Sequence, residues 1–529
     1  MGESIWKYVG AGGLLLLLWF ILSPQTFLRN SARGPWGQES REAGLEFPAP
    51  APQSSSQPSP KKQPASPAFD AGLETGAGKK VPGEKLVRFS SREAYRKFLA
   101  GAPPGAVLGQ LDALLVARVR SGEWLGAAVR ESGGSVSSNY YVRVPEVPLE
   151  VREKGEEMYR AVGKKALDLI GAEGVTDAWG RGVKVALMDT PLEGVEQVSG
   201  ETAGHGTAMR SLITGAADSV RGAAPGAEVV PFAVLDQEGK GSSFVLAEAI
   251  LKAADQGARV INMSLGSEGD SPVVRDAVAY ALGKNVVLVA AAGNEAVNRV
   301  SYPAAYEGVV AVASVDGGAL PGNLPAHLYF SNRGKQVDVA APGLAVLAAW
   351  PGGKKVVVSG TSASTALVSG AISALLSQEP GLSGRQAVEL ITRYADGSGL
   401  PGSAEETGGG ILNLGRVLNR NQRGVVDVAL GGVKLVSEGQ QGRILVGIQN
   451  RGNETVNSPS LEITVGAERR KFYFGSLAPG QTASESMSFD WARARQAGNI
   501  QAGAVVTVRG DQQENNNSWM GYFRIPTEP

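Results

Sequence analysis

Four side chains in this sequence have the chemistry of an acyl-transfer site. In chain order they are a carboxylate, an imidazole, a carboxamide and a hydroxyl, carried by Asp189, His205, Asn294 and Ser362. A serine hydroxyl becomes an effective nucleophile when a base accepts its proton, and His205 can act as that base. Asp189 would fix the imidazole tautomer. Asn294 and the backbone N–H of Ser362 would donate hydrogen bonds to the oxyanion of a tetrahedral intermediate.

The local sequence puts each of these residues at the end of a strand or at the start of a helix. Asp189 comes after the apolar run 183–188, and Ser362 comes after a second apolar run at 356–358. His205 lies between two glycines, which add no side-chain volume and allow a close approach of the backbone. Taken singly, such residues have ordinary structural explanations, because Asp is common in turns and Ser is common at helix N-caps. Their order and placement together favour a shared site.

The segment that holds these residues alternates short apolar, β-branched runs with helical patterns. Apolar strands that alternate with helices are typical of a mostly parallel sheet covered on both faces. Functional groups in such folds gather at the carboxyl ends of the strands. The sequence therefore predicts an α/β fold, a mostly parallel sheet flanked by helices. The predicted strands are 183–188, 229–235, 260–263, 286–290 and 309–315, and the predicted helices include 244–256 and 272–282.

The composition excludes several kinds of function. Lys and Arg total 51, as do Asp and Glu, so the charge gives no electrostatic reason to expect a nucleic-acid partner. The chain has no cysteine, which excludes disulfides, thiolate metal sites and a cysteine nucleophile. Its two histidines are His205 and His327, so a histidine base has few candidates.

Residues 1–30 are interpreted as an N-terminal membrane anchor or signal segment. Residues 5–22 are apolar except for Lys7, a length between that of a signal-peptide core and that of a membrane-spanning helix. No clear cleavage site comes after them, which favours an uncleaved anchor. Residues 31–83 are rich in Pro, Ser, Ala and Gly and predict a disordered linker.

Further domains are predicted on either side of the α/β segment. Residues 84–148 contain strand patterns and a short helix, which predict a small α+β domain, and residues 149–170 predict a charged helical spacer. Residues 423–529 contain short apolar strands separated by Gly, Asn and Pro turns. This pattern predicts a C-terminal β-sandwich.

Residues 171–422 resemble the subtilisin-like serine proteases, the subtilase family. The resemblance rests on Asp-Thr at 189–190, Gly-His-Gly-Thr at 204–207 and Gly-Thr-Ser at 360–362, in the family's order, with Asn294 at the oxyanion position. It implies a serine endopeptidase that hydrolyses peptide bonds through an Asp-His-Ser triad and an acyl-enzyme. A further segment, Ile-Asn-Met-Ser-Leu-Gly at 261–266, matches the family's substrate-binding strand. The substrate-binding residues implied are Ser264, Leu265, Gly266, Ala292 and Gly293.

The sequence also departs from the family pattern. Pro191 stands directly after the aspartate motif, Ala363 and Ala366 stand in the serine motif, and the interval from Asp189 to His205 is short. None of these changes removes a group that does chemistry. The alternative that they leave is a catalytically inactive subtilase-like scaffold or adhesion protein that binds peptide segments. A serine esterase is a weaker alternative, because no Gly-x-Ser-x-Gly elbow surrounds the serine.

The flanking units carry resemblances of their own. Residues 84–148 resemble the propeptide of such proteases, which implies a zymogen that cleaves itself between about residues 144 and 172. Residues 423–529 resemble a CARDB-type immunoglobulin-like domain. The resemblance implies no cofactor for the chemistry, and a structural calcium ion is compatible with it but cannot be assigned to residues. We expect protein or peptide substrates and a cell-envelope protein, membrane-anchored with its catalytic domain outside the cytoplasm and released after processing.

Overall fold

The computed structural model describes residues 78–151, 159–194, 202, 204–216, 220–318, 324–438 and 441–525. All of these belong to one compact unit, Asp70–Pro529. The predicted anchor at residues 5–22 and most of the predicted linker lie outside the described residues. Within the described part, no helix is both long enough and apolar enough to cross a bilayer.

The centre of the described chain is a six-stranded sheet in the order β11-β10-β9-β8-β5-β6, with every neighbouring pair parallel. Its inner strands are short, apolar and buried on both faces, as expected for a parallel sheet covered by helices. The strands are β5 (Lys184–Asp189), β6 (Glu228–Ala233), β8 (Val260–Met263), β9 (Val287–Ala291), β10 (Val309–Val315) and β11 (Val337–Pro342).

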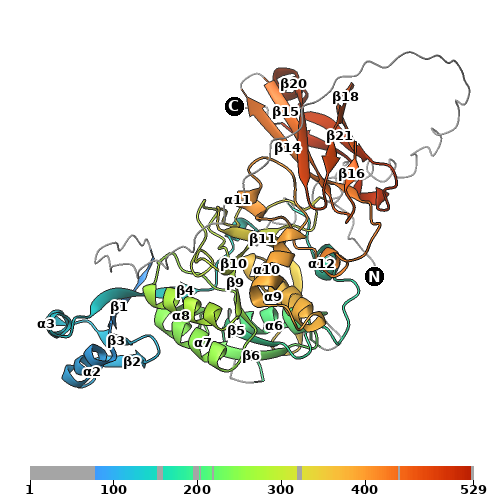
Figure 1. Ribbon diagram of the computed structural model, residues 1–529. Helices are drawn as coiled ribbons and strands as arrows, with labels where there is room; N and C mark the ends of the chain where they lie inside the picture. Colours follow the sequence, from blue (N-terminus) through green and yellow to red (C-terminus); the bar gives the residue numbers. More distant parts are fainter. Residues whose placement is uncertain are drawn as a thin grey trace, which may run out of the picture. The chain divides into compact units, whose positions relative to one another are not determined.

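Helices cover both faces of this sheet (Figure 1). On one face, α7 (Ser243–Asp255) packs beside α8 (Pro272–Gly283); on the other, α6 (His205–Thr214) packs against α9 (Thr361–Gln378). Alternate residues of each strand serve the two layers: in β5, Val185 and Leu187 join the core under α6 and α9, while Ala186 and Met188 join the other. The predicted α/β fold with flanking helices is therefore confirmed.

The N-terminal unit is a small α+β element that shares a sheet with the α/β part. Its strands form the order β2-β3-β1-β4-β7, in which β7 (Lys240–Ser242) comes from the α/β segment. Helices α2 and α3 pack on a separate core that contains Phe89, Tyr95 and Phe98. The elements are β1 (Lys80–Arg88), α2 (Arg92–Gly101), β2 (Val107–Leu111), β3 (Val116–Arg120), α3 (Glu123–Ser132) and β4 (Ser135–Arg143).

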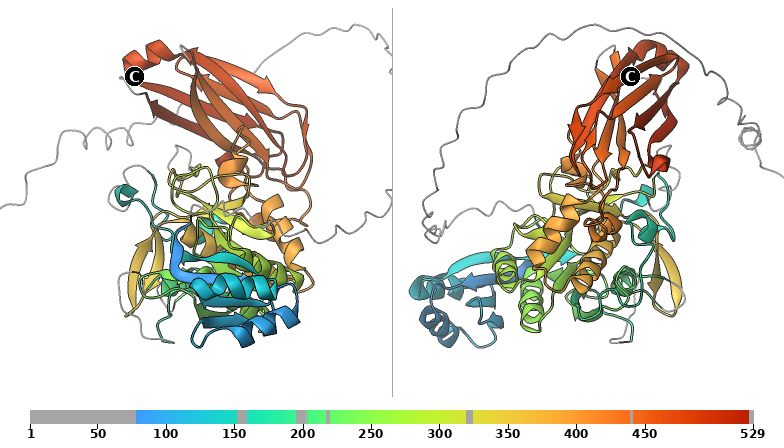
Figure 2. Two further views of the ribbon diagram at one scale, coloured as in Figure 1. Left: turned by 90° about the vertical axis from the view of Figure 1, so that its left-hand side faces the viewer. Right: turned by 45° about the vertical axis from the view of Figure 1, so that its right-hand side comes forward.

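The C-terminal region is β-rich, and its strands lie in two layers (Figure 2). One sheet has the order β14-β15-β20 and the other β18-β17-β21-β22, and residues of both form one core. The immunoglobulin-like assignment stays a prediction. The strands are β14 (Val428–Glu438), β15 (Gln441–Asn450), β17 (Ser460–Val465), β18 (Glu468–Tyr473), β20 (Thr482–Asp490), β21 (Asn499–Thr507) and β22 (Ser518–Arg524).

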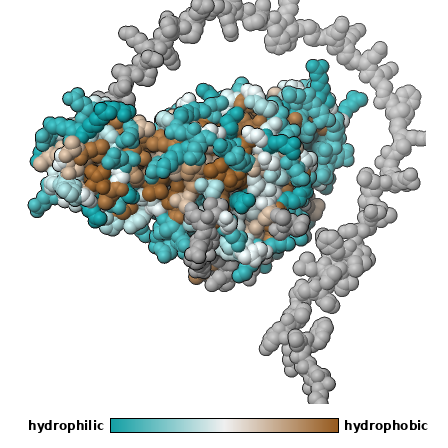
Figure 3. All heavy atoms as spheres, turned by 90° about the horizontal axis from the view of Figure 1, so that it is seen from below, coloured by the Kyte–Doolittle hydropathy of each residue, from teal (hydrophilic) through white to brown (hydrophobic). Residues whose placement is uncertain are grey.

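Shorter elements complete the described part. Strands β12 and β13 form a hairpin beside α6, and residues 162–163 bond to Leu344 and Ala345 just before it. Strand β6, at the edge of the six-stranded sheet opposite to β11, is half-exposed. When the molecule is seen from below, hydrophobic residues gather along the middle of the surface (Figure 3). The elements are α5 (Ala166–Leu169), β12 (Val346–Trp350), β13 (Lys354–Val358), α10 (Gly384–Arg393), α11 (Ala404–Thr407), α12 (Leu414–Leu418), β16 (Val456–Asn457), β19 (Ser476–Leu477), α13 (Trp491–Ala497) and η1 (Glu514–Asn516).

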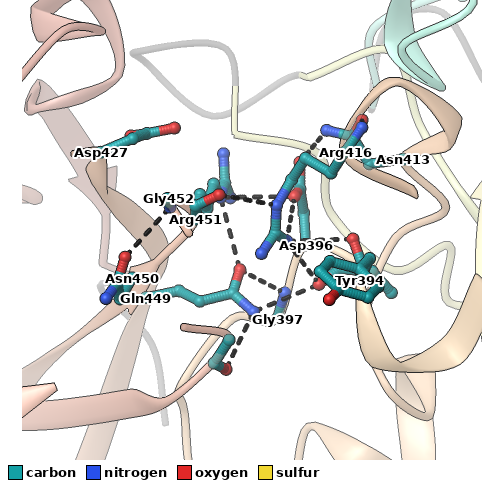
Figure 4. Close-up of polar contacts among 12 residues, drawn as sticks. Tyr394, Asp396, Gly397, Asn413, Arg416, Asp427, Gln449, Asn450, Arg451 and Gly452 are labelled. Atoms are coloured by element: carbon teal, nitrogen blue, oxygen red, sulfur yellow. Dashed lines mark hydrogen bonds and ion pairs between the residues drawn. The ribbon is translucent and has the colours of Figure 1, made fainter. Parts of the chain in front are cut away.

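A buried polar network joins the end of the α/β part to the β-rich region (Figure 4). Asp396 pairs with Arg416 at 2.9 Å and with Arg451 at 3.5 Å, and Arg416 also donates to the Arg451 carbonyl at 3.1 Å. Gln449 accepts from the N–H of Gly397 at 2.9 Å. Because the side chains of Arg416 and Asp396 are only 11% and 17% exposed, the loss of one partner would leave a poorly solvated charge.

We expect Arg416→Met to destabilise the folded chain by about 3 kcal/mol, because it removes the main partner of a buried carboxylate. Arg385→Met is the matched control: Arg385 is 89% exposed and pairs with Glu389 on the surface, so its loss should change stability by less than about 0.5 kcal/mol. Urea unfolding of both variants measures the difference. Equal stability of the two variants would contradict the importance of the network.

His327 is a partly buried histidine. Its backbone forms an isolated antiparallel β-bridge with Val315. The Nε2 atom of its ring has no hydrogen-bond partner in the described part of the chain. Burial, with a smaller contribution from Arg333, lowers the pKa of His327 to about 4. The folded state therefore favours the neutral ring, whereas the unfolded state binds a proton below its ordinary pKa of about 6.5.

Since the folded pKa of His327 is the lower one, its contribution to stability is present above about pH 6.5 and is lost as the pH falls toward 4. His327→Gln should remove this contribution. Between pH 7 and 4.5 the native chain should lose about 2–3 kcal/mol more of its unfolding free energy than the variant. Parallel pH dependence in urea titrations of the two proteins would refute this assignment.

Candidate active site

The structure brings two of the four predicted residues into direct contact. Asp189 is the last residue of β5 and is 1% exposed, and its Oδ1 lies 2.7 Å from Nδ1 of His205, the first residue of α6. The N–H of Thr190 also donates to Oδ1, at 2.7 Å. With Nδ1–H donated to a buried carboxylate, Nε2 of His205 is left free to accept a proton.

The glycines beside His205 are required by close packing. A Cβ on Gly204 would run into the indole of Trp350, and one on Gly206 would run into the carbonyl oxygen of Thr190. The N–H of Gly206 donates to the Thr190 hydroxyl at 2.9 Å, which ties the start of α6 to the end of β5. The interpretation of the glycines as sites of close backbone approach agrees with this packing.

Ser362 is the second residue of α9 and is 4% exposed. Its Oγ donates to the carbonyl oxygen of Ser264 at 3.2 Å, and the Ser264 hydroxyl donates to the Ser362 carbonyl at 3.0 Å. Ser264 is held in turn by Asn262, whose Nδ2 donates to its hydroxyl at 3.0 Å. In this arrangement the Ser362 hydroxyl is directed to Ser264 and not to His205.

Asn294 presents its amide N–H groups to a peptide carbonyl. Its Oδ1 accepts from the N–H and from the hydroxyl of Thr361, both at 3.0 Å, which fixes the orientation of the carboxamide. Its Nδ2 then donates to the carbonyl oxygen of Pro145 at 2.9 Å. This is the geometry required of a donor that would stabilise an oxyanion formed on a bound peptide.

Pro145 reaches this position because the end of the N-terminal unit runs through the site as a strand. Arg143 exchanges two backbone hydrogen bonds with Gly266, at 2.9 and 2.8 Å, and the N–H of Val144 donates to the Gly239 carbonyl at 3.1 Å. On the other side, β4 pairs with β7. The segment thus lies between Gly266 and β7, in a mode that an extended substrate could adopt.

The other predicted substrate-binding residues are Leu265, Ala292 and Gly293. Leu265 is fully buried in the same core as Val142 of the segment. Ala292 is also buried, and its carbonyl accepts from the N–H of Ser301 at 2.9 Å. Gly293 has a φ of +106°, and a Cβ there would collide with Asn332, so glycine is required.

Sequence reasoning did not find three participants in the site: Pro145, Glu268 and Glu295. They line a cavity of about 30 Å³ together with Arg143, Gly266 and Ser301, among others. Glu268 lies 4.0 Å from the Arg143 guanidinium, and Glu295 accepts from Asn332 at 2.6 Å. The available signal was proximity in sequence, since Glu268 is two positions after Gly266 and Glu295 is directly after Asn294.

No group of three or more His, Asp or Glu residues suited to a metal occurs among the described residues.

Comparison with known proteins gives a consistent result. A family model described as the subtilase family matches residues 180–410. The chain is 34% identical over 254 residues to a thermostable alkaline protease of Halalkalibacterium halodurans, covering 45% of this chain and 68% of that protein. It is 35% identical over 243 residues to thermitase of Thermoactinomyces vulgaris, covering 42% and 85%. The structure of fervidolysin from Fervidobacterium pennivorans, a keratinolytic enzyme related to subtilisin, shares the fold: the TM-score is 0.54, the identity 19%, and the coverage 85% of this chain and 92% of that one.

We expect Asn294→Ala to lower kcat for a peptide substrate by about 10²–10³-fold with little change in KM, because it removes a donor to the oxyanion. Asn298→Ala, at an exposed asparagine on the same loop, is the control and should leave both constants unchanged. Steady-state kinetics on folded variants, checked by circular dichroism, measures the split. A kcat for Asn294→Ala within a few-fold of the native value would exclude the oxyanion role.

Proposed function

From the premise that this chain belongs to the subtilase family and is a serine endopeptidase, we propose that Asp189, His205 and Ser362 form its catalytic triad, with Asn294 as oxyanion donor. The observation that carries the proposal is the contact of 2.7 Å between Asp189 and His205, with a peptide carbonyl held 2.9 Å from Asn294.

The geometry suggests how the reaction would proceed. Nε2 of His205 takes the proton of the Ser362 hydroxyl as Oγ attacks the scissile carbonyl carbon. The oxyanion that forms accepts hydrogen bonds from Asn294 Nδ2 and the Ser362 N–H, a group without a partner inside its own helix. Collapse breaks the C–N bond, and the leaving amine takes the proton from His205. Water then hydrolyses the acyl-enzyme by the same steps, and subtilases need no cofactor for this chemistry. A structural calcium ion stays unassigned.

The protease is proposed to be made as a zymogen that cuts itself between Pro145 and Glu146. Two observations support this bond: the Pro145 carbonyl lies at Asn294, and Arg143 is paired with Gly266 just before it. The bond lies within the interval expected from the sequence. Until it is cut, the N-terminal unit fills the position of a substrate and acts as an inhibitor.

The membrane tether is proposed from the sequence alone, through the apolar residues 5–22. Cleavage after Pro145 would separate the protease from that segment, with the catalytic part outside the cytoplasm. Protein or peptide substrates are the expected partners, and the balanced charge gives no reason to add nucleic acid. Since the relatives compared are proteases, the alternative of an inactive peptide-binding scaffold is not favoured.

The test is fluorophosphonate labelling of the full chain beside Ser362→Ala, with self-cleavage monitored on a gel and the new N-terminus sequenced. Labelling and cleavage that both disappear in Ser362→Ala, with Glu146 as the new first residue, are the expected result. Labelling with a cut at another bond would overturn the processing assignment. A folded native chain that neither labels nor cleaves would overturn the triad.

A further inference from the structure

Strand β22 (Ser518–Arg524) is the last strand of its sheet, and one of its edges has no partner strand among the described residues. The sheet order is β18-β17-β21-β22, so β22 pairs with β21 alone. Just past its end, the N–H of Ile525 donates to the Gly498 carbonyl, so the odd-numbered residues of β22 direct their backbone groups to β21. The backbone N–H and C=O groups of its even-numbered residues therefore point to the free edge.

The edges formed by β18 and β6 carry features that block the addition of a strand. In β18, the opposite edge of the same sheet, residues 468–471 are all charged. In β6, the N–H of Glu228 donates to the Val183 carbonyl, so the backbone of Pro231, three residues on, points away from β5 and has no N–H to offer. Edge charges and prolines are usual protections against strand pairing. Strand β22 has no proline and no charge before Arg524.

The free edge of β22 also exposes apolar side chains. Met520 is 64% exposed and Tyr522 is 62% exposed, and both belong to the residues whose backbone groups are free. Strand pairing would satisfy these backbone groups and remove part of both side chains from water. The edge is therefore suited to an added strand.

We propose that two copies of this chain form a symmetric dimer in which β22 pairs antiparallel with β22 of the second copy, centred on Gly521. In this register Met520 lies opposite Tyr522 of the partner subunit, and Ser518 lies opposite Arg524 of the partner subunit. These even-numbered residues carry the free backbone groups, so each such pair exchanges hydrogen bonds across the edge. Because each arginine meets a serine, the register has no pair of like charges.

The strand itself favours this register over its neighbours. A centre at Gly521 pairs every residue from 518 to 524, whereas a centre one residue away leaves residues at one end of each strand unpaired. Symmetric pairing also closes the assembly, because both copies contribute the same edge. Pairing of β22 with β18 of another copy would instead continue into a filament, and the charged residues 468–471 disfavour it.

The direction of pairing also separates the two α/β parts. Ser518, at the start of β22, lines a cavity together with Asn413 and Arg416, which belong to the end of the α/β part. Arg524 is at the other end of the strand. Antiparallel pairing therefore places the two α/β parts at opposite ends of the paired strands. This inference goes beyond the proposed function and does not rest on it.

The first experiment is sedimentation velocity of the full chain in mild detergent, with Ser362→Ala in every sample so that the chain stays in one piece. Met520→Pro is compared with Met520→Ala. Both lack the methionine side chain, and only the proline lacks the N–H that faces the free edge. Since each dimer would lose two hydrogen bonds, one from each copy, the proline variant should have a dimer dissociation constant about ten-fold or more above that of the alanine variant.

Tyr473→Ala is the surface control, because Tyr473 is 73% exposed on β18 and should not affect the dimer. Circular dichroism and urea midpoints check that each variant is folded, since residue 520 does not donate to β21. A chain that is monomeric at every concentration, equal dissociation constants for the proline and alanine variants, or a dimer weakened only by Tyr473→Ala would each overturn the proposal.

A second experiment tests the register by disulfide formation, which is clean because the chain has no cysteine of its own. Met520→Cys and Tyr522→Cys chains are mixed under mild oxidation. The Cα atoms of facing residues in a hydrogen-bonded pair are about 5.5 Å apart, within reach of a disulfide, whereas the same residue in the two copies would be about 8 Å apart, beyond it. Mass spectrometry should therefore find cross-links between the two variants in excess of those within each variant. Equal amounts, or none from a dimeric chain, would overturn the proposed pairing.

Discussion

The site depends on the burial of helix α9. Every residue from Thr361 to Leu376 is buried, and most are Ala, Ser, Gly or Thr. Small side chains let the helix axis come close to the sheet, where it packs against β8 to β11 and against α6. Because the helix packs close to the sheet, its first turn, which carries Ser362, lies beside the ends of the strands. Larger residues would move that turn away from the ends of the strands.

A second constraint is the edge pairing that the site offers to an extended chain. Gly266 and β7 present backbone groups on two sides, and the end of the N-terminal unit fills both. Backbone pairing gives affinity without dependence on side chains, so recognition of particular residues has to come from the side chains that line the cavity. Two carboxylates, Glu268 and Glu295, line that cavity, and Arg143 is the basic side chain that pairs with Glu268.

Much of the fold and site could be predicted because the signals are local. The apolar runs at 183–188, 260–263 and 309–315 correspond to β5, β8 and β10 within one residue. The predictions for Asp189 and His205 rest on their positions at the end of a strand and at the start of a helix, and the structure puts the two side chains in contact.

The rest depends on contacts between residues distant in sequence. The residues of β7, Lys-Gly-Ser at 240–242, have no strand pattern of their own, and they form a strand that pairs with β4. The position of Pro145 at Asn294 joins residues 149 apart in sequence. None of these carries a sequence signal of its own.

The attachment of residues 159–163 has a consequence for the mature protein. Arg160 donates from its N–H to Asp316 at 3.2 Å, and residues 162 and 163 bond to Leu344 and Ala345. If the chain is cut after Pro145, the new end at Glu146 stays tethered by about fourteen residues, a reach of no more than about 50 Å. A tethered end has an effective concentration on the order of millimolar near its own docking position. The leaving-group side of the cleft would then have a resident competitor, which each incoming substrate must displace.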